Sequence, residues 1–162
     1  MTELPDNFDK IVEQCILMEI EAMNLYMKLA GRVKDERTGD VLRDLARMEE
    51  SHVGRLVEIF SANRKGADKA FSHVDIIKAF QPEALKMHHA RMAGAGLSDT
   101  SSLDDYLLFA IAGETHARAY YQHLSEEAPE PLAKEIFLTL SREEADHEMR
   151  LKDIRQSYRE EG

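Results

Sequence analysis

The sequence contains a single cysteine, Cys15, and this scarcity excludes several kinds of site. Neither an internal disulfide nor a Cys-x-x-Cys pair can form, so these 162 residues hold no four-cysteine iron site and no zinc ribbon. No basic residue close to Cys15 in the sequence would activate its thiol. We therefore expect Cys15 to pack as a small, buried apolar side chain.

Helix breakers and long apolar runs are also scarce. Four prolines and eight glycines in 162 residues favour long helices. No stretch approaches the roughly 20 apolar residues of a membrane span. The polar, acidic residues 1–10 lack the apolar segment of a secretory signal. These absences predict a cytoplasmic protein that does not bind a membrane.

Positive charge is the third shortage. The 21 Lys and Arg residues are outnumbered by 31 Asp and Glu residues, which gives a formal net charge of -10. Nucleic-acid binding needs a basic face, so we expect no nucleic-acid partner. The length fits one domain, residues 1–162, that can bury a hydrophobic core.

The apolar periodicity predicts four long helices. The first covers residues 7–34 and is followed by a polar turn at 35–40 that contains Gly39, and the second runs from there to about 63. The third begins after a capping box formed by Ser102 and Asp105, and the fourth runs from the prolines at 129 and 131 to about 159. Short turns within the first and the last pair predict two antiparallel hairpins.

A long connection separates the two hairpins. It opens with a break at residues 65–68, extends to about 102, and carries helical patterning over 74–80 and 82–92. Pro82 suits the first position of a helix, so we expect short helices here. Such a crossover would make the second and third long helices run parallel. His73, His88 and His89 have no acidic partner at ligand spacing in the sequence, which predicts solvated or packing roles.

An internal repeat is the strongest organisational signal. At an offset of 95 residues and without a gap, residues 16–29 match 111–124 and residues 45–59 match 140–154. The matched pairs include Glu19 with Glu114, Tyr26 with Tyr121, Glu49 with Glu144, and His52 with His147. The two hairpins therefore look like copies of one unit.

The apolar stripe of each long helix is interrupted by ionisable residues. Six of them stand at core positions: Glu19, Glu49, His52, Glu114, Glu144 and His147. We call these the six candidate ligands. Burial of one uncompensated carboxylate costs several kcal/mol, and four together would disrupt a core unless cations or protons neutralised them. Two divalent cations balance four glutamates, and two neutral imidazoles complete the coordination.

A metal site has to be weighed against ordinary buried polar groups. About one Glu-x-x-His is expected by chance in a chain this rich in glutamate, and a lone buried His or Glu is more often a hydrogen-bonded core residue. Here two Glu-x-x-His motifs and two further glutamates share one offset and one core phase. Because residues i and i+3 share a helix face, each motif can direct both side chains to one metal. The combination favours a two-metal site.

The residues around this site leave other choices open. Tyr26 and Tyr121 are either core aromatics with locally bonded hydroxyls, or hydrogen-bond partners or electron relays of the site. Metal-bound histidines normally donate their other N–H to an outer acceptor. The candidates for that acceptor are Asp44, Glu50, Glu143 and Asp146, and the sequence does not choose among them.

The motifs Glu19-x-x-Ala22-x-x-x-Tyr26, Glu49-x-x-His52, Glu114-x-x-Ala117-x-x-x-Tyr121 and Glu144-x-x-His147 resemble those of the rubrerythrin-like branch of the ferritin-like superfamily, over nearly the whole chain. The resemblance implies an all-α, ferritin-like four-helix bundle with a carboxylate-bridged di-iron site. Glu49 and Glu144 would be the bridges. Glu19 with His52, and Glu114 with His147, would be terminal ligands.

Two departures separate this chain from rubrerythrins proper. Those proteins carry a cysteine-ligated rubredoxin domain, for which this chain lacks the cysteines. They also have an extra glutamate three residues after the third-helix ligand, used when one iron shifts during redox change, and that position is Ala117 here. The resemblance therefore does not extend to the iron-shift route.

The resemblance implies a non-haem di-iron oxidoreductase that reduces hydrogen peroxide or dioxygen. Its electrons would come from a separate donor such as a rubredoxin-like protein, and the chain would form a homodimer. Two alternatives belong to other classes: a ferroxidase or iron carrier, and a non-catalytic bundle that holds zinc or manganese.

Overall fold

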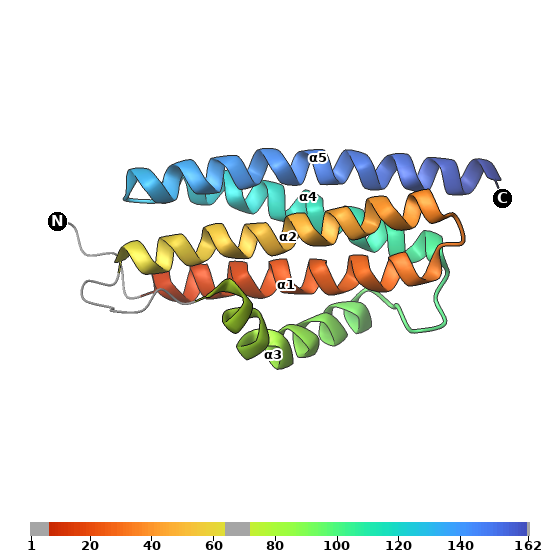
Figure 1. Ribbon diagram of the computed structural model, residues 1–162, viewed down its shortest axis with the longest axis horizontal. Coiled ribbons are helices and arrows are strands. Elements are labelled where there is room, and N and C mark those ends of the chain that lie inside the picture. Colours follow the sequence, from red (N-terminus) through yellow and green to blue (C-terminus); the bar gives the residue numbers. More distant parts are fainter. Residues whose placement is uncertain (1–6, 64–71, 162) are drawn as a thin grey trace.

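The computed structural model describes residues 7–63 and 72–161, and within these residues it contains five helices and no strand. Four long helices lie side by side as a bundle: α1 (Phe8–Arg32), α2 (Glu36–Asn63), α4 (Leu103–Glu127) and α5 (Pro131–Glu161). The shorter α3 (His73–Gly94) lies outside the bundle (Figure 1). The predicted all-α, four-helix architecture is confirmed. None of the five helices combines the length and the apolar character of a membrane span.

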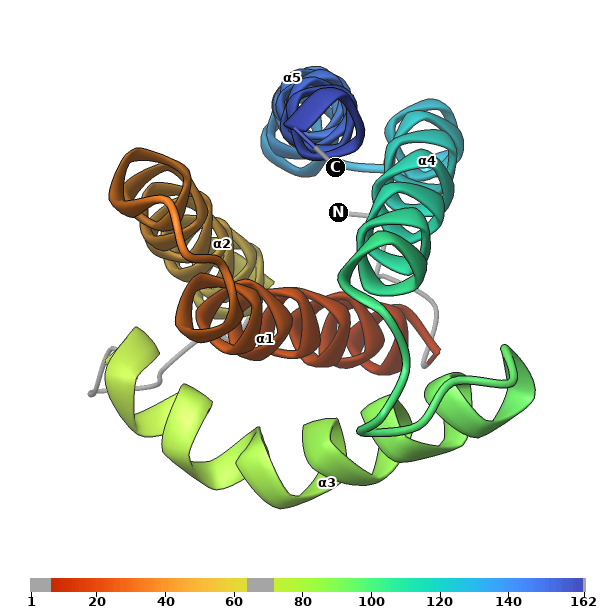
Figure 2. The same cartoon turned by 90° about the vertical axis from the view of Figure 1, so that its right-hand side faces the viewer.

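The long helices form two antiparallel hairpins, α1 with α2 and α4 with α5. The chain direction in Figure 1 makes α2 parallel to α4, as the crossover predicts. Viewed along the bundle, α3 crosses beneath α1, from the side of α2 towards the side of α4 (Figure 2). One side of the bundle is therefore covered by α3.

The predicted turn at 35–40 is wrong, because α2 already begins at Glu36. The carboxylate of Asp35 accepts hydrogen bonds from the backbone N–H and the hydroxyl of Thr38, at 2.9 and 2.6 Å. An aspartate that accepts an N–H three residues ahead starts a helix. Gly39 therefore lies within the helix, where its N–H donates to the carbonyl of Asp35.

The predicted pair of short crossover helices is also wrong. One 22-residue helix covers both patterned segments, and Pro82 lies inside it rather than at a first position. A proline inside a helix removes one backbone hydrogen bond and favours a bend, and α3 is curved in Figure 1. The helix ends as predicted, since Gly96 adopts φ +73° just beyond it. The predicted break at 65–68 lies outside the described residues.

Serine side chains cap two helices, and the cap of α4 is the one that the sequence predicts. Ser102 accepts a hydrogen bond from the N–H of Asp105 at 3.1 Å and so begins α4. Ser72 accepts from the N–H of Val74 at 3.2 Å and begins α3. Cys15 is fully buried, and burial raises the pKa of its thiol well above the usual value, so it packs as an apolar side chain.

The apolar core is divided into two clusters along the bundle. One contains Val12, Cys15 and Phe137, and the other contains Leu29, Leu42 and Leu107. The six candidate ligands lie between the two clusters, so apolar layers close the site at both ends along the bundle.

Candidate metal centre

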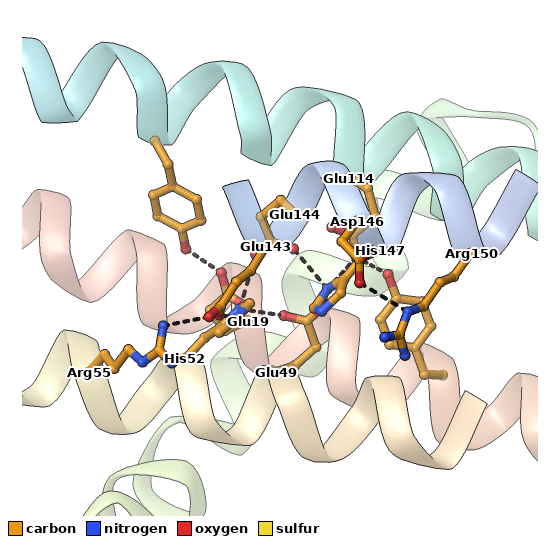
Figure 3. A network of polar contacts seen from close by, with 12 residues as sticks. Glu19, Glu49, His52, Arg55, Glu114, Glu143, Glu144, Asp146, His147 and Arg150 are labelled. Carbon is orange, nitrogen blue, oxygen red and sulfur yellow. Dashed lines mark hydrogen bonds and ion pairs between the residues drawn. The ribbon is translucent and has the colours of Figure 1, made fainter. Parts of the chain in front are cut away.

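The structure brings all six candidate ligands together in the middle of the bundle (Figure 3). Each of these residues is at most 3% exposed, and each of the four long helices contributes: Glu19 from α1, Glu49 and His52 from α2, Glu114 from α4, and Glu144 and His147 from α5. The helical phase of the stripes accounts for this convergence, since every member replaces an apolar core residue.

The six side chains form two overlapping donor groups. The first donor group comprises Glu19, Glu49, His52 and Glu144, and the second comprises Glu49, Glu114, Glu144 and His147. Within each group, one potential ligand atom per residue lies within 4.8 Å of all the others. Glu49 and Glu144 belong to both groups. Each group could hold one metal ion, with these two carboxylates reaching both.

Both histidines direct Nδ1 towards the carboxylates. Nδ1 of His52 lies 3.1 Å from Glu49 and 3.1 Å from Glu144. Nδ1 of His147 lies 2.8 Å from Glu49 and 3.0 Å from Glu144. The two imidazole rings stack with centroids 5.3 Å apart. Nδ1 is therefore the nitrogen available to a metal on both sides.

Burial and mutual charge set the protonation of the cluster without metal. Burial, together with the neighbouring carboxylate of Glu144, raises the pKa values of Glu19 and Glu114 well above the usual range. For Glu49 and Glu144, burial acts in the same direction but is outweighed. Hydrogen bonds from other site groups, including both imidazoles, hold the pKa of Glu49 below and that of Glu144 well below the usual range.

The histidines shift in the complementary direction. Burial alone would lower their pKa values, but the surrounding carboxylates raise the pKa of His147 to about 9 and that of His52 well above its usual value. In the metal-free site these shifts favour the protonated forms of Glu19, Glu114 and both histidines and the ionised forms of Glu49 and Glu144. Without metal, protons therefore neutralise the buried carboxylates, as divalent cations could do when bound.

Each site tyrosine donates a hydrogen bond to a carboxylate of the other hairpin. Tyr26 donates to Glu114, and Tyr121 donates to Glu19. Both tyrosines are at most 1% exposed. Of the two arrangements that the sequence left open, the structure has the hydroxyls bonded to the cluster and not to the local backbone.

The two histidines differ on their outer side. Nε2 of His52 lies 2.7 Å from Glu143 on α5, whose other oxygen accepts a hydrogen bond from Arg55 at 2.9 Å. Among the described residues, Nε2 of His147 has no hydrogen-bond partner. Of the four acceptors suggested by the sequence, Glu143 alone contacts a site histidine. The other three acids pair elsewhere. Asp44 pairs with Arg47, Glu50 with His73, and Asp146 with Arg150.

A cavity of about 170 Å³ leads from the surface to the carboxylates. It lies between α1, α3 and α4, and exposed Gln14, Arg91 and His116 line its outer part. Small residues line its inner part: Ala22, Ala110, Gly113 and Ala117. The carboxylates of Glu19, Glu49, Glu114 and Glu144 also line the cavity. The cavity therefore borders the carboxylates on the side that α3 covers.

A polar cluster around the buried Glu21 holds α3 against the bundle, and the sequence did not reveal it. Glu21 on α1 is 1% exposed and accepts a hydrogen bond from Arg91 at 2.6 Å, with Nδ1 of His88 at 3.3 Å. His88 is buried, whereas the sequence suggested no acidic partner for it. The guanidinium of Arg91 also lies 4.9 Å from the ring centroid of Phe109 on α4. These contacts position Arg91 beside the cavity.

Comparisons with known proteins agree with this architecture. A family model described as Rubrerythrin matches residues 10–91 and 105–161. No curated protein sequence matches the chain significantly. Two crystal structures of a manganese catalase from Anabaena are similar in fold, with 20% and 18% identity and TM-scores of 0.65 and 0.66; each match covers 98% of this chain and 77% of that one. The bundle is thus ferritin-like, as the sequence predicted.

Proposed function

The chain belongs to the rubrerythrin family, and on that premise we propose that it is a non-haem di-iron oxidoreductase that reduces hydrogen peroxide or dioxygen. Its electrons come from a separate donor, such as a rubredoxin-like protein. For peroxide the balance is one H2O2, two electrons and two protons giving two waters, with the O–O bond broken and the donor oxidised.

The donor chemistry of the site fits two divalent cations. The two donor groups each offer three carboxylates and one imidazole, and the shared Glu49 and Glu144 suit a carboxylate-bridged pair. Four glutamates buried together need compensation that this pair of cations supplies. In this proposal Glu19 with His52, and Glu114 with His147, are the terminal ligands.

The observation that carries the redox proposal is the cavity that ends on the carboxylates. A metal site that only supports the fold is closed by its ligands, whereas a reactive site keeps an accessible side. The cavity lining is mostly small or apolar near the carboxylates, and Arg91 at its outer part is paired with Glu21. Such a passage suits a small uncharged oxidant.

When bound, two iron ions would supply the electrons by passing between the ferrous and ferric states. The chain's own residues do the rest. The two apolar clusters exclude water from above and below the site. Tyr26 and Tyr121 orient the carboxylates of Glu114 and Glu19 by hydrogen bonds. Ala117 leaves open the space in which rubrerythrins proper place an additional glutamate.

Manganese is the second candidate metal. The fold neighbours are manganese catalases, and oxygen-rich sites accept several divalent ions. With manganese the reaction would be disproportionation, two H2O2 giving two H2O and one O2, which needs no electron donor. Evolution of dioxygen without a donor distinguishes this reaction from a peroxidase.

The test is a single-turnover experiment on apoprotein loaded anaerobically with two equivalents of Fe(II). After addition of one equivalent of H2O2, we expect the loss of peroxide and the oxidation of two Fe(II) to be much faster than in protein-free buffer. Iron oxidation no faster than in buffer would refute the proposal. A parallel sample loaded with Mn(II), monitored with an oxygen electrode, tests the manganese alternative.

Ala117→Leu tests the role of the cavity, and Ala119→Leu is its matched control. Ala117 lines the cavity and is not a candidate ligand, so a larger side chain should slow the reaction with peroxide while two metals still bind. Ala119→Leu, at an exposed position of α4, should react like the wild type.

A further inference from the structure

The two halves of the site are unequal beyond the candidate ligands. Nε2 of His52 lies 2.7 Å from Glu143, and Glu143 is held by Arg55 at 2.9 Å. Nε2 of His147 is buried and has no hydrogen-bond partner among the described residues. The internal repeat gives the reason. At the offset of 95, Glu143 corresponds to Met48, and a thioether is only a weak acceptor.

The arginines show the same inequality. Arg55 and Arg150 correspond in the repeat, but Arg150 has no counterpart of Glu143 with which to pair. It pairs instead with Asp146 on its own helix, at 3.0 Å (Figure 3). The residue that corresponds to Asp146 in the first hairpin is Ser51. One histidine therefore belongs to a His–Glu–Arg chain, and the other has no outer partner of this type.

We infer that Glu143 is a positioning residue that makes the two metal positions unequal, with tighter binding in the first donor group than in the second. A metal-bound imidazole is a better ligand when its other N–H is donated to a carboxylate, because the acceptor fixes the ring orientation and increases the basicity of the coordinating nitrogen. His52 has this support and His147 does not. The metal beside His147 is the more readily exchanged one.

This inference rests on the proposed metal centre, but it does not depend on which reaction the centre performs. Repulsion between two cations also separates two binding steps, so the wild type alone cannot decide the question. The repeat offers variants that can. Glu143→Met gives the first half the residue of the second half. Met48→Glu gives the second half the residue of the first, with Arg150 on the same side.

The experiment is a titration of each metal-free protein with Mn(II), in which the electron paramagnetic resonance of free Mn(II) gives two stepwise Kd values. Glu143→Met should raise the lower Kd about 10- to 100-fold and leave the other unchanged. Glu143→Gln retains a neutral acceptor and should have a smaller effect. Met48→Glu should lower the higher Kd by a similar factor, and the double variant should show two steps like the wild type.

Several results would overturn the inference. Variants that change both Kd values alike would show that Glu143 acts only through overall stability. A Met48→Glu variant that folds, as judged by circular dichroism, but binds Mn(II) like the wild type would show that the outer carboxylate does not set affinity. Failure of the wild type to bind either Mn(II) or, under anaerobic conditions, Fe(II) would remove the metal centre itself, whereas two steps insensitive to both substitutions would leave the centre and refute only the inequality.

Discussion

The hydroxyl of Tyr121 on α4 donates a hydrogen bond to the carboxylate of Glu19 on α1. Tyr26 on α1 donates in the same way to Glu114 on α4. Each tyrosine belongs to one hairpin and holds a carboxylate of the other, so the pair connects the hairpins through the site. Burial raises the pKa of Tyr121 well above its usual value, which keeps the hydroxyl protonated as a donor.

We expect Tyr121→Phe to destabilise the metal-loaded protein by about 1–3 kcal/mol, because it leaves a buried carboxylate with one donor fewer. Tyr26→Phe should cost a similar amount, since the repeat gives it the equivalent partner. Urea denaturation of the loaded proteins measures both. Tyr158→Phe, at a 42% exposed position, is the control. Equal stability of the Tyr121 and Tyr158 variants would contradict this role.

Metal binding should release about four protons for two divalent ions near pH 7. The raised pKa values of Glu19, Glu114 and both imidazoles favour the protonated forms of these groups in the metal-free site. If the ligands had ordinary pKa values, metal binding would release less than about one proton. A pH indicator in weakly buffered solution measures the release. Release of less than one proton would show that the metal-free site is not protonated in this way.

The stability of the metal-free protein should fall as the pH rises from about 6.5 to 9. The folded-state pKa of His147 is raised to about 9 by its carboxylate neighbours, against about 6.5 in an unfolded chain. A raised pKa means that the stabilisation is complete below the unfolded value and is lost as the pH rises through the folded value. His52 and the two raised carboxylates shift in the same direction.

Thermal melts across this pH range test that dependence. Metal-loaded protein should not lose stability between pH 6.5 and 9, because the metal holds these ligands in their deprotonated forms. Metal-free protein with a constant Tm over the same range would contradict the assigned protonation. On the acid side, the lowered pKa values of Glu49 and Glu144 predict a loss of stability as the pH falls below about 4.5.

Glu21→Ala should release α3 from the bundle. The substitution leaves His88 buried without its carboxylate and Arg91 without its ion pair, a change that typically costs about 3–5 kcal/mol when the partner is buried. Arg91 is 42% exposed, so we expect the lower end of that range. Hydrogen exchange should become faster in α3 and stay unchanged in α5. Uniformly unchanged exchange would show that Glu21 does not hold α3.

The fold was predictable where local pattern and burial agree. The four long helices and the parallel arrangement of α2 and α4 follow from apolar periodicity, caps and the length of the connection. Two details were not. Residues 35–40 have the composition of a turn, but Asp35 uses its side chain to begin α2. Taken alone, Pro82 indicates a helix start, yet α3 continues through it. The outer side of α3 faces away from the bundle, so no other bundle helix opposes a bend there (Figure 2).

The convergence of the six candidate ligands was predictable, because ionisable residues stand at the same core positions in both copies of the repeat. Their surroundings were less so, since they depend on contacts between residues far apart in the chain. Glu143 lies 91 residues from His52, so its selection from four similar acids required the packing of α5 against α2. Glu21 stands outside the core stripe of α1, and it is buried because α3 packs over it. The apolar periodicity of the sequence does not predict where α3 packs on α1.

The most direct test of the account is the metal content of the reconstituted protein, measured by elemental analysis after removal of free metal. The wild type should retain two divalent ions per chain, and Glu144→Ala should retain fewer, because Glu144 contributes to both donor groups. Two ions per chain in both proteins would remove Glu144 from the site. A wild type that retains no metal would contradict the two-metal centre itself.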